Sequence, residues 1–504
     1  MMVLLTLLLL LLFVAVSYLY ISYKIRYQFW KKRNVPYLQP TFPIGNMLDS
    51  FKQKHFAYTA QDFYNKLKHH GDYAGVFFFK KPVLVVLSPE FAKTVLVKDF
   101  QYFVDRGIYY NKEDDPLSAN LFFIEGDEWR QLRTKMTPTF TSGKIKVMFH
   151  TMLEVAENLV EHLSNLAPNL NEPMEIRDYL ARYTTDVIGS CGFGIECNSI
   201  ANPQSEFRAM GKKMFNFSQF KNFKIFLGML MRKQARALRM VFNDDEVTNF
   251  VMQIVEKTIK HRKENNIQRN DFMQLMIDLY RDETEGVTED SLTLKEIAAQ
   301  SFLFFFAGFE TSSTTMTYAL HELAVNPDIQ DKLRSEINDR FNKNDGAFSY
   351  DSVMSMTYMD QVINETLRKY PPVASLHRVL TKDYTLPNGS ILPQGNFVML
   401  PTYAFHHDPE FYPNPSKFDP NRFSEEVKAT RSPFCFLPFG EGQRICIGLR
   451  FGFIQAKVGL AMLLRHFKFS LCDKSNATLP IDNIHMLYVP LGDVWLNVEK
   501  IKCT

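Results

Sequence analysis

The chain has 504 residues, of which 46% are hydrophobic and 14% aromatic, ample for a large buried core. Its formal net charge of +3 is too small to favour nucleic-acid binding. Its six cysteines lack the spacing of a zinc site and suit a reducing compartment, in which a free thiolate can persist.

The N-terminal segment, residues 1–23, contains no charged side chain and is rich in leucine. It is long enough to span a bilayer. Basic residues follow at Lys24, Arg26 and 31–33, and the positive-inside rule then predicts that this flank stays in the cytosol. A cleavable signal peptide is the alternative, but neither a basic start nor a small-residue cleavage site is clear.

Three prolines, Pro36, Pro40 and Pro43, interrupt any helix after the basic residues and predict a stiff connector. The rest of the chain shows no internal repeat. We therefore expect a membrane anchor over residues 1–23, a basic, proline-rich connector over 24–46 and one large cytosolic domain over 47–504.

Most of residues 50–380 carries helical periodicity, which predicts a mainly α fold. Two stretches favour small β-sheets: residues 77–87, which read as a strand pair, and residues 384–400, which contain two turn signals. The acidic run at 282–290 predicts a solvated loop, and the proline-rich stretch 405–438 predicts an ordered loop.

Residues 210–240 mix phenylalanines with lysines, a composition suited to helices lying on a bilayer surface. The alternative is an ordinary helix pair whose phenylalanines face the core and whose lysines are solvated, and composition does not decide between the two. The residues concerned are Phe215, Phe217, Phe220, Phe223, Phe226, Lys212, Lys213, Lys221 and Lys224.

A long helix is predicted over residues 294–323, and its almost uncharged first half must be buried. The sequence AGFET at 307–311 interrupts this apolar run. Glycine inside a helix costs about 1 kcal/mol relative to alanine, and burying Glu310 costs more unless it is paired. One interpretation is a packing Gly308 with a partnered Glu310; the other is a site at this point of the helix.

Two pairs of side chains share predicted helix faces. Trp129 and Arg133 lie at i and i+4, and Glu365 and Arg368 lie at i and i+3. Arginine recognises carboxylates through a fork of parallel N–H groups, although a single arginine is also compatible with a surface salt bridge. Either pair alone is a common surface arrangement, so its meaning depends on the rest of the chain.

The sequence FGEGQRICIG at 439–448 is the most informative stretch. It places Cys446 in a glycine-rich loop, with Arg444 two positions earlier and a predicted helix over 447–464. Positive charge and a helix N-terminus both stabilise a thiolate, and Gly442 and Gly448 allow the backbone to approach a bulky group. A buried cysteine in a turn before a core helix is the alternative.

These residues fit F-x-x-G-x-R-x-C-x-G, which resembles the haem-binding loop of the cytochrome P-450 superfamily. Residues 307–312 (AGFETS) resemble its oxygen-binding helix, and Glu365 and Arg368 with Arg422 resemble its Glu–Arg–Arg cluster. The resemblance covers the chain and implies a mainly α fold with small β-sheets, as a single haem domain behind the anchor.

The implied cofactor is haem b, iron protoporphyrin IX, with the Cys446 thiolate as axial ligand. The resemblance assigns haem binding to Cys446, Arg444, Phe439, Gly442, Gly448, Trp129, Arg133, Arg378 and Arg106, with the arginines and Trp129 on the propionates. It assigns proton delivery to Glu310 and Thr311, Glu310 acting as a general acid through water. Glu365, Arg368 and Arg422 would lock the cysteine loop rather than take part in chemistry.

The implied reaction is monooxygenation, in which one atom of O2 enters the substrate and the other leaves as water. No G-x-G-x-x-G follows a predicted strand, so electrons are expected from a partner, by resemblance the NADPH–cytochrome reductase of the endoplasmic reticulum membrane.

Residues 103–107, 307–315 and 436–452 are similar to insect microsomal members of the sixth family, which implies oxidation of insecticides, plant toxins or hormones. The catalytic domain would face the cytosol. The expected pocket is apolar and suits lipophilic molecules. Its candidate residues are Phe122, Phe123, Phe304, Phe305, Ala307, Val373, Leu376 and Met486.

Two alternatives remain. A haem-thiolate isomerase or dehydratase would act on peroxides without external electrons, but such relatives usually lose the alcohol that Thr311 supplies. A haem or lipid carrier without catalytic activity is compatible with the composition, but it would have no need of Glu310 and Thr311. The sequence does not identify the substrate.

Overall fold

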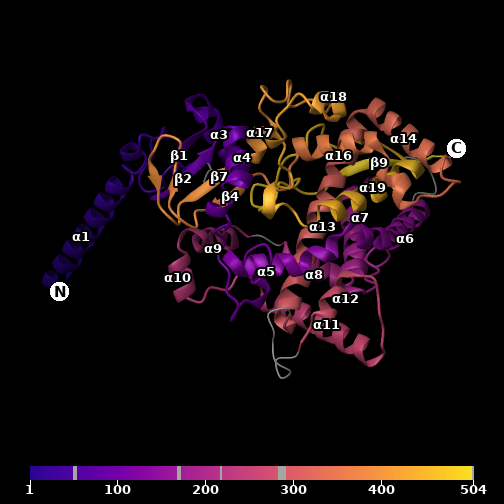
Figure 1. Cartoon of the computed structure of the whole chain (residues 1–504), viewed down its shortest axis with the longest axis horizontal. Coiled ribbons are helices and arrows are strands. Elements are labelled where there is room, and N and C mark those ends of the chain that lie inside the picture. The colour runs from indigo at the N-terminus through magenta and orange to yellow at the C-terminus, as the bar shows by residue number, and fades with distance from the viewer. Residues whose placement is uncertain (49–53, 167–171, 216–217, 282–290, 502–504) are drawn as a thin grey trace. The chain divides into compact units, whose positions relative to one another are not determined.

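The computed structural model describes residues 1–48, 54–166, 172–215, 218–281 and 291–501 (Figure 1). The predicted acidic loop at 282–290 lies outside these residues. The contacts divide the chain into two compact units, and each is described by itself. Unit 1 comprises residues 1–107, 373–413 and 432–445, and unit 2 comprises residues 108–372, 414–431 and 446–504.

Unit 1 contains the N-terminal helix and a small β-sheet. Its helices are α1 (Met2–Arg26), η1 (Lys31–Arg33), α3 (Phe56–Leu67), η2 (Lys68–His70), α4 (Pro89–Lys93), η3 (Thr94–Lys98), η4 (Phe100–Tyr102), α17 (Thr402–His406), η10 (Pro433–Cys435) and η11 (Gly442–Arg444). Its strands are β1 (Tyr73–Phe78), β2 (Lys81–Val86), β4 (Leu376–Val379), β5 (Tyr384–Thr385), β6 (Ile391–Leu392) and β7 (Phe397–Leu400).

The strand pair predicted at 77–87 is the antiparallel hairpin of β1 and β2, which begins earlier than expected, at Tyr73. The stretch 384–400 is divided between two sheets. Strands β5 and β6 pair with each other, whereas β7 pairs in parallel with β2 and antiparallel with β4. The prediction of one local sheet at 384–400 is therefore only partly right, because β7 has an apolar sequence that is buried against a strand distant along the chain.

The connector packs against strand β1 and does not extend into solvent. Trp30 is fully buried, and its indole N–H donates to the carbonyl of Val76 at 3.1 Å. Gly75 in β1 makes this packing possible, since a Cβ there would lie 2.4 Å from the indole ring. The amide of Leu38 also bonds the carbonyl of Gly75. The path of the connector is therefore set by this packing against β1.

Unit 2 is built mostly of helices. They are η5 (Pro116–Ser118), α5 (Gly126–Met136), η6 (Thr137–Phe140), α6 (Ser142–Leu166), α7 (Ile176–Ile188), η7 (Gly189–Phe193), α8 (Glu206–Met214), α9 (Gln219–Leu230), α10 (Arg232–Ala237), α11 (Asp245–Glu264), α12 (Phe272–Asp278), α13 (Leu294–Val325), α14 (Pro327–Asn342), α15 (Tyr350–Met354), α16 (Thr357–Lys369), η9 (Pro420–Phe423), α18 (Glu425–Lys428) and α19 (Leu449–His466). A three-stranded sheet has the order β3 (Glu172–Glu175), β9 (Trp495–Lys500), β8 (Phe467–Ser470).

Helix α13 forms the centre of unit 2 and packs against α7, α11 and α19. It begins at a capping box in which Thr293 and Glu296 satisfy each other's backbone N–H groups. The helix predicted at 294–323 is thus confirmed, and it continues without a break through Gly308. A mainly α fold with small β-sheets is likewise confirmed.

Candidate functional site

Cys446 lies in unit 2, immediately before the N-terminus of α19. Gly448 is the N-cap of this helix, so α19 starts at Leu449, two residues later than predicted. Among the cysteines in the described residues, Cys446 alone is exposed. Cys446 is therefore not buried, against the alternative interpretation, and it precedes the helix end that carries the positive pole of the dipole.

Arg133 from α5 is electrostatically coupled to Cys446. Burial lowers the pKa of the Arg133 guanidinium, and the negative charge of a Cys446 thiolate opposes that shift. On the same helix Trp129 is 2% exposed and belongs to the core. The predicted face of α5 therefore brings a cation toward the cysteine, and this interaction favours the thiolate.

The middle of helix α13 has an accessible face. Ala307 is exposed, while Leu303, Phe306 and Thr311 are half-buried, and the hydroxyl of Thr311 donates to the carbonyl of Ala307 at 2.6 Å. We call Leu303, Phe306, Ala307 and Thr311 the open face. Their helical spacing places them on one side of α13. This side is therefore an apolar surface with the hydroxyl of Thr311 at its C-terminal end.

Gly308 has a packing role. A Cβ at this position would lie 2.4 Å from Cδ1 of Ile188, on α7. The interpretation of Gly308 as a packing glycine is therefore correct, and the small residue on the open face is Ala307.

Glu310 is buried and paired. Its Oε1 lies 3.2 Å from Nη2 of Arg177, at the start of α7, and the hydroxyl of Thr314 lies 3.5 Å from the same oxygen. Arg177 also donates through Nη1 to the carbonyls of Pro490 and Gly492. Burial lowers the pKa of His485, and the negative charge of Glu310 opposes this shift.

Glu365, Arg368 and Arg422 come together in unit 2. Arg368 donates from Nε and Nη2 to the two oxygens of Glu365 at 2.7 and 2.8 Å, and both side chains are fully buried. Nε of Arg422 lies 3.4 Å from Oε1 of Glu365. The amide of Asp419 donates to the same oxygen. The cluster thus joins α16 to η9 with the buried carboxylate fully engaged.

Unit 1 holds the other predicted arginines. Arg444 is fully buried, donates from Nε to the carbonyl of Val104 at 3.0 Å and has Nη2 3.8 Å from Asp105. Its own carbonyl accepts from Nη2 of Arg106 at 3.1 Å. Arg378, on β4, is 2% exposed. Burial lowers the pKa of Arg378 to about 10, and its Nε has no hydrogen-bond partner among the described residues.

Within the described residues, the neighbours of the loop glycines Gly442 and Gly448 are other protein atoms. Gly442 has φ +74°, and a Cβ there would lie 2.1 Å from the carbonyl oxygen of Leu96. Its close approach is therefore to the backbone of η3. Gly448 is less constrained, since its Cβ position is 3.8 Å from the ring of Phe140, an ordinary contact. Phe439 is half-buried.

The predicted pocket residues fall into different environments. Phe304 packs against Phe140 and Phe272, and Phe305 packs against Phe207, with ring centroids 5.0–5.3 Å apart. These two phenylalanines belong to the aromatic core. Met486 is 46% exposed. Phe122 and Phe123, in unit 2, and Val373 and Leu376, in unit 1, are half-buried.

Sequence reasoning missed Arg177, His485 and Phe306. The spacing of the predicted helix contained a signal for Phe306, which lies between Leu303 and Ala307 on the open face and stacks on Phe215 with ring centroids 4.4 Å apart. For Arg177 and His485 the sequence near Glu310 contained no signal.

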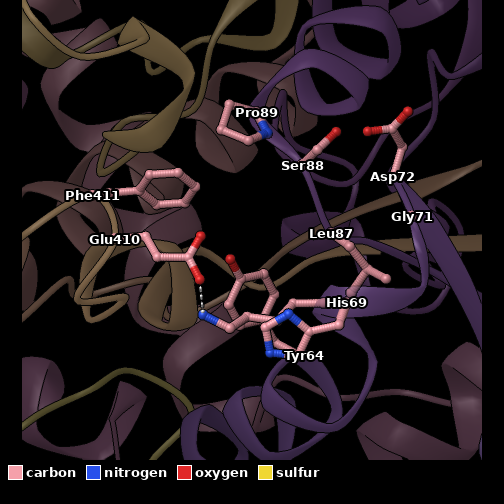
Figure 2. A pocket seen from close by; sticks show the side chains of 10 residues that line it. Tyr64, His69, Gly71, Asp72, Leu87, Ser88, Pro89, Glu410 and Phe411 are labelled. Atoms are coloured by element: carbon pink, nitrogen blue, oxygen red, sulfur yellow. Dashed lines mark hydrogen bonds and ion pairs between the residues drawn. The ribbon is translucent and has the colours of Figure 1, made fainter.

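A separate hollow of about 360 Å³ lies in unit 1 (Figure 2). Lys68 bridges Asp408 at 2.9 Å and Glu410 at 2.8 Å beside it, and Tyr64 donates to Asp408 at 2.7 Å. This network holds η2 against the segment after α17. No predicted site residue lines this hollow, so we assign it no role in the reaction.

Predicted residues within each unit have the chemistry that a haem requires. An exposed cysteine at a helix N-terminus offers a soft thiolate ligand, and the buried Nε of Arg378 lacks a partner that a carboxylate would supply. Arg133, Cys446, the open face and Glu310 belong to unit 2, and Arg106, Arg378 and Arg444 belong to unit 1.

Comparisons with known proteins agree. The sequence model of the family described as Cytochrome P-450 matches residues 36–492. Cytochrome P-450 6A1 of Musca domestica is 42% identical over 488 residues, 95% of this chain and 96% of that protein. Probable cytochrome P-450 6a23 of Drosophila melanogaster is 44% identical over 499 residues, 98% of this chain and 99% of that protein. The chain therefore belongs to the cytochrome P-450 family.

Proposed function

We propose that this cytochrome P-450 monooxygenase oxidises lipophilic small molecules at the endoplasmic reticulum membrane, with its catalytic domain in the cytosol. Its substrates would be insecticides, plant toxins or insect hormones. Electrons would come from NADPH through a separate NADPH–cytochrome reductase. Family members bind haem through a cysteine thiolate, and we assign that ligand to Cys446.

The observation that carries this assignment is the setting of Cys446. It is exposed, precedes the N-terminus of α19 and is coupled to the charge of Arg133. Cys435, in η10, is buried and has its carbonyl bonded by Tyr412. When bound, the thiolate-ligated haem supplies the activation of O2. Arg106, Arg133, Arg378 and Arg444 would hold its carboxylates, with Trp129 supporting Arg133 from the core.

Proton delivery would use Glu310 and Thr311. Thr311 presents its hydroxyl on the open face, and Glu310 lies one residue earlier, on the buried side. A carboxyl group that is held by Arg177 and reached by water would pass protons toward the hydroxyl as a general acid. Arg177 offsets the cost of burying this carboxylate, because a buried carboxylate destabilises the fold unless it is paired.

The open face supports lipophilic substrates. Leu303, Phe306 and Ala307 are apolar, and the exposed Met486 is a further candidate contact. Such a surface binds by burial of apolar area and provides little to orient a charged substrate.

Helix α1 supports membrane attachment. It lies within the helical stretch Met2–Arg33, which is long and apolar enough to cross a bilayer. The most apolar 18 residues of this stretch are not buried by the rest of the described protein. Basic residues follow on the side expected to face the cytosol.

The experiment measures NADPH consumption and product formation with purified reductase and a panel of lipophilic compounds. We expect O2-dependent hydroxylated product in proportion to NADPH consumed. Peroxide rearrangement without NADPH would instead identify an isomerase or dehydratase, and tight binding without any product would identify a carrier.

A further inference from the structure

The end of α1 is fixed to the β1–β2 hairpin. Tyr27 packs on Phe77 with ring centroids 5.0 Å apart, and Tyr20 and Tyr23 pack on Phe42 at 5.5 and 5.2 Å. Trp30, buried against Gly75, adds a second contact with the hairpin, whereas Phe42 belongs to the connector. Figure 1 shows one end of α1 beside β1 and β2. Side chains at this junction therefore have a defined position relative to the apolar helix.

The junction is strongly basic. Residues 24–48 contain no aspartate or glutamate. Lys24, Arg26, Lys31 and Lys32 are exposed, and the β1–β2 turn adds Lys80, whose Nζ lies 5.9 Å from the ring centroid of Tyr23. Cations just beyond a membrane helix lie at the depth of lipid headgroups and attract anionic lipids.

Arg26 and a further cation, Lys81, line a hollow of about 90 Å³. Arg26 reaches it from α1 and Lys81 from β2, and the segment 393–397 closes its other side. Lys81 Nζ lies 5.2 Å from the ring centroid of Phe397. None of the described residues that line the hollow is acidic. The neighbouring Asp383 is engaged, since it accepts the amide of Gln394 at 2.8 Å.

We propose that this hollow binds the phosphate-bearing headgroup of an anionic phospholipid, with Arg26 and Lys81 as its cations. Arginine offers a fork of donors for phosphate oxygens, and lysine adds a point charge. The site rests on the proposed membrane insertion of α1, which brings the hollow to the headgroup layer. That placement favours a lipid over free phosphate, because the acyl chains can lie beside α1.

The test uses the haem-loaded full chain in phosphatidylcholine vesicles that contain a trace of spin-labelled phosphatidylserine or spin-labelled phosphatidylcholine. Electron paramagnetic resonance measures the fraction of each label immobilised by the protein. We expect about a fivefold preference for phosphatidylserine. Arg26→Gln with Lys81→Gln should reduce it to near parity, and Lys81→Gln alone should give an intermediate value.

Lys66→Gln with Lys98→Gln is the matched control. It removes the same charge from exposed positions on α3 and η3, outside the hollow, and should keep the preference. An equal loss in both double variants would overturn the site in favour of diffuse attraction. The lipid site is also overturned if wild type shows no preference, or if inorganic phosphate abolishes it where sodium chloride of equal ionic strength does not.

Failure of membrane insertion gives a different result. In that case neither label is immobilised and the full chain does not float with vesicles, which overturns the anchoring as well as the lipid site. Immobilisation of both labels to the same extent overturns the lipid site alone. The CO spectrum of each reduced variant reports whether its haem domain is folded.

Discussion

Nη2 of Arg177 lies 3.2 Å from Oε1 of Glu310, so the acid predicted to deliver protons is held by a cation from α7. Arg177 is itself fixed by the carbonyls of Pro490 and Gly492. The arrangement keeps a buried carboxylate in one orientation and links it to a half-buried guanidinium. We interpret Arg177 as a positioning residue for Glu310.

Arg177→Gln should lower the fraction of NADPH converted to product by about tenfold, a part of what general acid catalysis supplies. Without its cation the buried carboxyl loses the partner that orients it. The measurement is the ratio of product formed to NADPH consumed. Arg177→Lys should restore most of the activity, and a glutamine variant with the wild-type ratio would rule out the role.

Thr311→Ala should retain haem and substrate binding but release peroxide, because proton delivery loses its hydroxyl. We expect roughly a tenfold lower ratio of product to NADPH. Thr311→Ser, which keeps the hydroxyl bonded to the Ala307 carbonyl, is the matched control. An unchanged ratio in the alanine variant would remove Thr311 from the relay.

Cys446→Ser should abolish activity and the strongly red-shifted Soret band of the reduced CO complex, since an alcohol cannot replace the electron-rich thiolate. Cys435→Ser is the control. Cys435 is buried in η10, so its replacement should cost at most about 1–3 kcal/mol of stability and leave the band in place. The reverse pattern would assign the ligand to Cys435.

Much of the site followed from local sequence, because its residues lie at fixed helical or loop spacings. Cys446 before α19, the Ala307 and Thr311 face of α13 and the pair Glu365–Arg368 are of this kind. Arg177 could not be found in this way, since its partner lies 133 residues away and only the packing of α7 on α13 joins them. The packing of Trp30 on Gly75 was missed for the same reason. Phe304 and Phe305 were expected to line the pocket but lie in the aromatic core. An apolar side chain on a helix can belong to either, and the sequence does not distinguish the two.

His377 makes the stability of the haem domain dependent on pH. Burial lowers its pKa from 6.5 to about 4, helped by the charge of Arg378. Below pH 6.5 the unfolded chain gains a proton that the folded chain does not, so stability falls as pH drops from 6.5 to about 4. The maximum loss is about 3 kcal/mol.

The measurement is the urea-unfolding free energy at pH 7 and pH 4.5. His377→Gln should unfold with a smaller difference between the two values than wild type. His70→Gln, at an exposed position, is the matched control for loss of one histidine. Equal differences in the two variants would contradict the assignment.

We predict a second membrane contact at helix α9. Phe220 and Phe223 are 76% and 48% exposed, whereas Phe215 is 9% exposed and stacks on Phe306 of the open face. Phe217 lies outside the described residues. Phe215 therefore packs inward, as the helix-pair interpretation expects, and Phe220 and Phe223 face outward beside Lys221 and Lys224. Binding of this segment to a bilayer stays a prediction. Apolar side chains flanked by lysines bind the interface of a bilayer.

A protein that lacks residues 1–23 should therefore still float with liposomes, but more weakly than the full chain. Phe220→Ser with Phe223→Ser should abolish the remaining flotation, since each phenylalanine loses roughly 1.5–3 kcal/mol of apolar burial. Phe215→Leu, a conservative change in the core, is the control and should float like the truncated parent. Truncated protein that stays in solution, or that floats equally without the two exposed phenylalanines, would leave α1 as the sole attachment and make the exposed rings of α9 ordinary surface residues.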